Sequence, residues 1–228
     1  DYYNRSRGYL TYDPQLPKEL IAASTTLEGH FALVNHQLLQ VRTALALAQA
    51  LDRALIMPPL WCGFDRWWAP HRGKIPGSDL QLPFQCPMDH VFEVEAWLRK
   101  RDEHQHGRSI DFREHSFLDN PRTPPAVRQS RLRVAVCQAG APGCQPAAAV
   151  ANQPAAATPG ALVVAGGMTD EQARSLFLKY HKYQVLEFTS MSKEVFGGFE
   201  AEADGRRFHE RMKTYTGIWC CIHAHPGH

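Results

Sequence analysis

Residues 25–37, TTLEGHFALVNHQ, combine a glycine turn with amide side chains and are the segment best suited to bind a polar ligand. Backbone N–H groups at a helix start can hold an anion, and Gly29 would let a ligand approach closely. Asn35 would bring an amide group to the first turns of the helix, where a sugar or a base edge could be read. The residues predicted to contact a nucleotide sugar or sugar are Gly29, His30, Asn35, Gln37 and Arg42.

The same residues have a purely structural interpretation. A helix can begin at a glycine turn and keep its polar residues on the side that faces water. The residues alone favour this interpretation, because one glycine is common at a helix start.

A second segment, residues 60–68, carries three tryptophans among glycine and charged residues. Indole rings stack on the C–H faces of sugars, and Asp or Arg beside them can bind hydroxyls. The predicted acceptor-binding residues are Trp61, Asp65, Arg66, Trp67 and Trp68. Tryptophans that fill the core beneath a long loop are an equally good interpretation.

The elements that would position these residues form a βαβ unit. Residues 24–27 are predicted as a strand, 28–30 as a turn, 31–51 as a helix and 54–57 as a buried strand closed by two prolines. The helix has one apolar stripe, made of Val34, Leu38, Val41, Leu45 and Ala48. This unit favours a parallel sheet with a ligand crevice at the carboxyl ends of its strands.

The rest of the chain continues the α/β pattern. Further strands are predicted at residues 91–94, 131–137, 161–164, 184–188 and 217–221, and helices at residues 169–180, where Thr169 and Gln172 form a capping box, and 208–215. We predict a Rossmann-like parallel sheet flanked by helices. The expected organisation is a linker over 1–18, a first part of the core over 19–138, a flexible insertion over 139–160 and a second part of the core over 161–228. The insertion is predicted because its Ala, Pro, Gly, Gln and Asn residues bury too little side chain to offset the entropy of ordering.

Composition excludes several partners. The 228 residues include 25 Lys and Arg against 23 Asp and Glu, so a net charge of +2 gives no general attraction to nucleic acid or to an anionic membrane. No apolar run reaches the roughly 18–20 residues of a membrane helix. Because the chain begins at Asp1 rather than Met, we expect it to be part of a longer protein, with any membrane anchor outside this chain.

Six cysteines permit disulfides. Cys137 and Cys144 flank a turn-rich segment that can bring two thiols together, and Asn4-Arg5-Ser6 is a glycosylation acceptor sequence. Both features favour a secretory compartment, with a cytosolic protein with buried free thiols as the alternative.

No metal or cofactor site is predicted. The segment from Cys220 to His228 lacks the paired spacing of a zinc knuckle, so an exposed His-rich tail after two strand-end thiols is the favoured interpretation. The sequence has no P-loop, no nucleophile elbow, no zinc-protease motif and no Asp-x-Asp pair, which would bind a divalent ion and a nucleotide diphosphate.

Several blocks resemble the plant arabinosyltransferases that build the arabinose chains on extensin hydroxyprolines (glycosyltransferase family 77). They are AASTTLEGHFALVN (22–35), LIMPPLWC (55–62), PFQCPMDHVFEV (83–94), FREHSFLDNP (112–121) and YTGIWCC (215–221). The resemblance implies a Golgi type II membrane protein that transfers L-arabinofuranose from UDP-arabinofuranose to a hydroxyproline-rich cell-wall glycoprotein. It also implies that the metal-binding Asp-x-Asp domain lies upstream and that this chain is a carboxyl-terminal module without a cofactor of its own.

A shorter resemblance covers about a quarter of the chain. Gly29 to Gln37, the Ala/Leu-rich helix and the strand ending at Pro58-Pro59 look like the opening βαβ unit of protein O-fucosyltransferases, whose comparable loop lines the nucleotide-sugar cleft of a two-lobed fold. Three hypotheses follow. The chain is part of an arabinosyltransferase, a non-catalytic module that binds the glycopeptide acceptor, or a metal-independent fucosyltransferase-like enzyme that uses GDP-fucose.

Overall fold

The computed structural model describes residues 2–3, 7–64, 82–92, 94, 104, 109, 111–154 and 160–213. Its centre is a six-stranded sheet in the order β5-β2-β1-β9-β6-β7, and every neighbouring pair is parallel. The strands are β1 (Tyr9–Tyr12), β2 (Ala54–Ile56), β5 (Phe112–Arg113), β6 (Arg131–Cys137), β7 (Leu162–Ala165) and β9 (Val185–Phe188). The prediction of a Rossmann-like α/β fold is confirmed.

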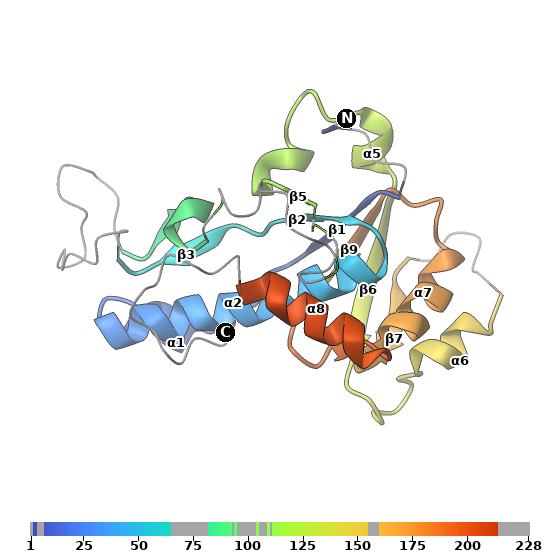
Figure 1. The fold of residues 1–228 in the computed structure, drawn as a ribbon. Helices are drawn as coiled ribbons and strands as arrows, with labels where there is room; N and C mark the ends of the chain where they lie inside the picture. Colours follow the sequence, from blue (N-terminus) through green and yellow to red (C-terminus); the bar gives the residue numbers. More distant parts are fainter. Residues whose placement is uncertain are drawn as a thin grey trace.

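Helices cover both faces of this sheet (Figure 1). One face packs against α2 (Leu27–Ala50), α7 (Asp170–Leu178) and α8 (Glu202–Lys213), with α6 (Ala147–Ala151) lying against α7. The other face packs against α5 (Pro125–Gln129) and the 3-10 helix η2 (His115–Leu118). Alternate residues of each strand serve the two faces, so Leu10 and Tyr12 join the first core and Tyr9 joins the second.

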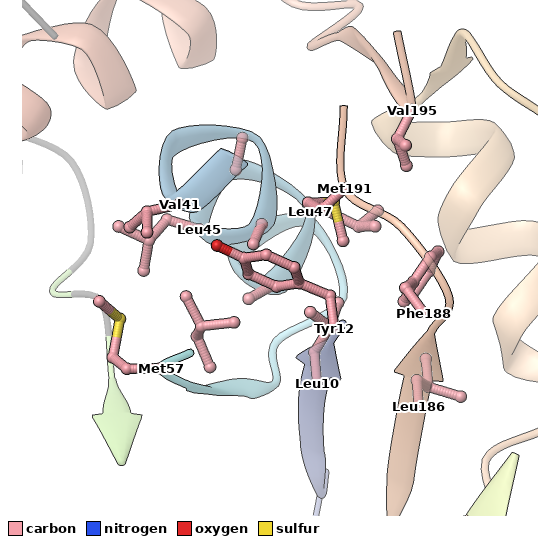
Figure 2. Close-up of a cluster of buried hydrophobic side chains, with 14 of the residues drawn as sticks. Leu10, Tyr12, Val41, Leu45, Leu47, Met57, Leu186, Phe188, Met191 and Val195 are labelled. Carbon is pink, nitrogen blue, oxygen red and sulfur yellow. The ribbon is translucent and has the colours of Figure 1, made fainter. Parts of the chain in front are cut away.

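The larger core surrounds α2. All five residues of the predicted apolar stripe are buried. Figure 2 shows two of them, Val41 and Leu45, close to the ring of Tyr12, which extends from β1. Burial raises the pKa of the Tyr12 phenol, so this group stays neutral.

The strand that opens the βαβ unit differs from the prediction. The structure forms β1 inside the segment expected to be a linker, and residues 24–27, predicted as a strand, lie instead at the junction of α1 (Lys18–Ala23) and α2. Thr26 is the N-cap of α2 and its hydroxyl accepts a bond from the N–H of Gly29, at 3.1 Å. This cap starts the helix four residues before Phe31, because it satisfies an N–H group of the first turn.

The Ala/Pro-rich segment also contains structure that the composition did not predict. Helix α6 lies within residues 139–160, and its Ala147 and Ala151 are buried in the main core. Small side chains suffice here because α6 packs closely against α7. The Cys137–Cys144 disulfide, which the sequence favoured, closes the turn before α6 and is confirmed.

Two short sheets and one short helix complete the described fold. Strands β3 (Leu60–Cys62) and β4 (Phe84–Cys86) pair antiparallel and are joined by a second disulfide, Cys62–Cys86. Strands β8 (Met168–Thr169) and β10 (Phe196–Gly198) pair parallel. The described residues of the predicted strand over 91–94 do not form a strand. Val91 and Phe92 instead follow the 3-10 helix η1 (Met88–His90), and both are buried.

The remaining predicted elements agree with the structure apart from their ends. Strand β6 has the predicted bounds, and the Thr169–Gln172 capping box begins α7. The predicted strand over 217–221 lies outside the described residues. None of the described helices is both long and apolar enough to cross a lipid bilayer.

Candidate functional site

The carboxyl ends of the parallel strands border two cavities. The larger has a volume of about 1140 Å³ and lies where β2 and β5 end, against the β3–β4 hairpin. Its lining includes Pro58 after β2, Glu114 and His115 after β5, and Gln85 and Cys86 of β4. The carboxyl edge is where open parallel sheets bind ligands, because the connecting loops diverge there.

Arg113 organises one side of the larger cavity. Its buried guanidinium donates to the carbonyl oxygens of Tyr2 at 2.7 Å and Phe112 at 2.7 Å, and it forms an ion pair with Asp111 at 2.5 Å. The guanidinium also lies over the ring of Tyr2, 4.5 Å from its centroid. These bonds fix the end of β5, and therefore the positions of Glu114 and His115 that follow it.

The β3–β4 hairpin forms the opposite side of the larger cavity. The Cys62–Cys86 disulfide ties its two strands together. Gln85 of this hairpin reaches His115, with 2.9 Å between Nε2 of the amide and Nε2 of the imidazole. A polar contact therefore joins the hairpin to the edge of the main sheet.

His30, predicted to contact a ligand, is fully buried and holds the chain after β3. Its Nδ1 accepts backbone N–H bonds from Gly63 at 3.0 Å and Phe64 at 3.2 Å. Burial, together with the nearby His90, lowers the pKa of His30 from 6.5 to about 4. The imidazole is therefore neutral near pH 7, as an acceptor nitrogen must be.

Gln37 performs a similar task about two turns later along α2. Its amide nitrogen donates to the carbonyl of Trp61 at 2.8 Å, and its amide oxygen accepts the N–H of Trp61 at 2.8 Å. Because the same nitrogen also donates to the carbonyl of Leu33, the buried amide is used within the protein. The sequence analysis assigned Gln37 and Trp61 to two different ligand sites, whereas in the structure they are hydrogen-bonded to each other.

The other three residues of the first predicted site lie apart. Gly29 is in the first turn of α2, not in a loop, and a Cβ there would lie 1.8 Å from the carbonyl oxygen of Ala23, so its role is close packing of α1 on α2. Asn35 is half-buried on α2. Arg42 contacts His209 of α8, with 3.2 Å between Nη2 and Nδ1, and burial lowers its pKa.

None of the five predicted nucleotide-sugar residues lines either cavity, and neither does Trp61. Asp65, Arg66, Trp67 and Trp68 lie outside the described residues. Ligand contact by the predicted residues therefore stays a prediction. What the structure brings together is His30 and Gln37 of α2 with the segment from Trp61 to Phe64, which adjoins the hairpin of the larger cavity.

A second cavity, of about 800 Å³, lies at the other half of the same edge, at the ends of β6 and β7 and beyond β9. Its lining includes Gly166, Gly167, Ser190, Ser192 and Lys193. The N–H groups of Gly166 and Gly167 are bonded to backbone carbonyls, so they are not available to a ligand.

One group of described side chains offers the sulfur and nitrogen atoms that can bind a metal. It consists of Cys62, Cys86 and His90, whose possible ligand atoms lie within 4.8 Å of one another. The two sulfurs are joined in a disulfide and therefore carry no thiolate. In this oxidised state the group does not fit a metal ion. The Cys220 to His228 segment lies outside the described residues.

Sequence reasoning did not select the side chains that line the larger cavity. The signal that could have found them is their place in the chain, since Pro58 follows β2, Glu114 and His115 follow β5, and these two strands pair in parallel. Strand β5 has two residues, too short to recognise from a pattern of apolar residues.

No protein-family model matches the chain. Two crystal structures of POFUT1 resemble it: one in complex with GDP-fucose, with a TM-score of 0.45 and 14% identity over 92% of this chain and 51% of that one, and one apo form, with a TM-score of 0.43 and 14% identity over 94% of this chain and 53% of that one.

A sequence relative is much nearer. The chain is 40% identical over 231 aligned residues to arabinosyltransferase XEG113 of Arabidopsis thaliana, and the alignment covers 100% of the chain and 35% of the relative. The resemblance to plant arabinosyltransferases is thus confirmed. This chain is similar, from end to end, to a segment that makes up about a third of a plant arabinosyltransferase.

Proposed function

We propose that the chain is part of a glycosyltransferase that transfers L-arabinofuranose from UDP-arabinofuranose to hydroxyproline-linked arabinosides of extensin-like cell-wall glycoproteins. The observation that carries this proposal is the 40% identity to an arabinosyltransferase over the full length of the chain. The chain spans about a third of that relative, so the activity is proposed for the whole protein that contains it.

The geometry is compatible with this function. A parallel sheet with cavities at its carboxyl edge offers room for a sugar substrate. Because no Asp-x-Asp pair occurs in this sequence, we propose that any divalent ion that stabilises the departing nucleotide diphosphate is held by residues outside this chain.

We further propose that this part of the protein lies in the Golgi lumen, with a membrane anchor outside the chain. The two disulfides support an oxidising compartment, because cytosolic thiols are kept reduced.

The test uses the full-length protein that contains this chain. It is incubated with UDP-arabinofuranose and a hydroxyproline peptide that already carries arabinose, and the product is measured by mass spectrometry. The expected result is a mass gain of one pentose that depends on both substrates. Transfer of fucose from GDP-fucose with no pentose transfer would overturn the proposed donor.

A second function has support from the sequence. The missing Asp-x-Asp pair suits a module that binds the glycopeptide acceptor while another part of the protein performs the chemistry. Replacing Trp67 and Trp68 with Ala should then weaken glycopeptide binding and leave UDP binding unchanged. Unchanged glycopeptide affinity would count against this module.

A further inference from the structure

Two acidic side chains that line the larger cavity have no cationic partner among the residues that the structure describes. Asp89 of η1 and Glu114, which precedes η2, are both exposed, and neither forms an ion pair with a described residue. Glu114 occupies the N-cap position of η2, yet its side chain makes no capping bond. Its carboxylate oxygens are therefore free to accept hydrogen bonds from a ligand.

The third acid of the larger cavity already has a cationic partner within the protein. Asp111 pairs with Arg113, and that guanidinium also donates to the carbonyls of Tyr2 and Phe112. Arg113 is the only Arg or Lys among the described residues of the lining. Among the described residues of the lining, three acids therefore accompany one cation, a balance that favours a neutral ligand over an anionic one.

Carboxylates accept hydrogen bonds and donate none, so their natural ligands in a neutral molecule are hydroxyl groups. The lining also offers apolar surface from the half-buried Met88 and Phe112, against which the C–H faces of a sugar can pack. The volume of about 1140 Å³ exceeds the roughly 300–1,000 Å³ typical of small-ligand sites, so the cavity has room for more than one sugar ring.

We propose that the larger cavity binds a neutral pentose oligosaccharide, the glycan of the acceptor, with Asp89 and Glu114 accepting hydrogen bonds from its hydroxyls. This proposal rests on the proposed transferase function for the choice of pentose. It places the glycan against the β3–β4 hairpin, where the contact between Gln85 and His115 holds the two sides of the cavity together.

The experiment measures two affinities of the full-length protein by calorimetry, one for an arabinosylated hydroxyproline peptide and one for UDP. Asp89→Asn and Glu114→Gln remove the charge at nearly constant size. Glu171→Gln, an exposed acid in the first turn of α7 and outside both cavities, is the matched control.

Each cavity variant should weaken binding of the arabinosylated peptide about tenfold, because a hydrogen bond to a charged carboxylate is stronger than the one that the amide oxygen of the variant can still accept. UDP affinity should not change, and the control should match the wild type in both titrations. Wild-type peptide affinity in both variants overturns the site, and so does an equal loss of UDP affinity.

Failure of the site and failure of the proposed function give different results. If the variants lose the arabinoside but the wild type transfers no pentose from UDP-arabinofuranose, the glycan site stands and the proposed reaction falls. If pentose transfer occurs and both variants keep the wild-type KM for the acceptor, the reaction stands and the glycan site falls.

Discussion

His30 and Gln37 illustrate how a residue type permits a function without establishing it. Both have polar groups able to bind a sugar, and the sequence grouped them with Gly29 for that reason. The structure uses the two side chains to hold the backbone of Trp61, Gly63 and Phe64. Polar side chains are often satisfied by buried backbone groups, because an unpaired buried N–H costs as much as a lost hydrogen bond.

The lowered pKa of His30 makes stability depend on pH. The unfolded chain takes up a proton below pH 6.5, whereas the folded protein takes it up only below about pH 4. The unfolded state therefore binds more protons within this window, and the free energy of unfolding falls as the pH falls from 6.5 to 4, by about 3 kcal/mol at most. Above pH 6.5 this contribution is fully present.

His30→Asn keeps an acceptor near the position of Nδ1 and removes the titration, so the variant should lose less stability than the wild type between pH 7 and pH 4. Urea unfolding at both pH values measures the difference. The control is His181→Gln on the surface, which should follow the wild type. A His30→Asn variant with the wild-type pH dependence would show that another group is responsible.

At the scale of elements, the α1–α2 corner depends on a close approach of two backbones. A Cβ on Gly29 would lie 1.8 Å from the carbonyl oxygen of Ala23. Gly205 also lies in a helix, α8, but no atom lies within 4 Å of the position that its Cβ would take. The two glycines therefore differ in what an added methyl group would do.

Gly29→Ala should lower the free energy of unfolding by about 2 kcal/mol, because the helices must separate. Gly205→Ala should raise it by about 0.5–1 kcal/mol, because alanine loses less backbone entropy in a helix interior. Chemical denaturation of both variants measures the two signs. Equal effects would mean that α1 does not pack on α2 in this way.

The Cys62–Cys86 disulfide of the β3–β4 hairpin should contribute more to the free energy of unfolding than the Cys137–Cys144 disulfide before α6. Cys62 and Cys86 are 24 residues apart, and Cys137 and Cys144 are 7 apart. A longer closed loop restricts the unfolded chain more, so replacing the first pair with alanines should cost about 3 kcal/mol and about 1 kcal/mol more than replacing the second pair. Thermal unfolding of the two double variants gives the comparison, and a larger loss from the second pair would contradict it.

At the scale of the whole molecule, β1 is a central strand rather than part of a linker. It pairs with β2 on one side and with β9 on the other, and Tyr9 and Leu10 are fully buried. Residues 184–188 and 54–56 therefore meet across a strand that precedes both in the chain. Without β1 the sheet would lose the backbone hydrogen bonds that β1 forms with β2 and with β9.

Deletion of residues 1–16 should abolish cooperative folding, because β2 and β9 would each present an unpaired edge. Circular dichroism during heating detects the loss of the sigmoidal transition that the complete protein should show. If the shortened protein keeps that transition at the same temperature, the amino-terminal segment is a linker after all.

Local patterns in the sequence determined the α/β class and most of the elements. The apolar stripe of α2, the capping box of α7 and the alternation of β6 are each set by residues within a single element, so they could be predicted. Strand β1 could not, because a four-residue strand is recognised by the two strands that cover its edges, and these come later in the chain.

The cavity was decided by tertiary structure alone. Asp89, Glu114 and Gln85 come together because β2 and β5 end at the same edge and the β3–β4 hairpin closes against it. The pairing of β2 with β5 joins segments more than fifty residues apart. The spacing of residues along the chain predicts which side chains share a helix face, but it does not predict which loops meet at a sheet edge. For that reason His30 and Gln37, chosen from the sequence for chemistry, are found holding the backbone, and the residues that surround the cavity were found only in three dimensions.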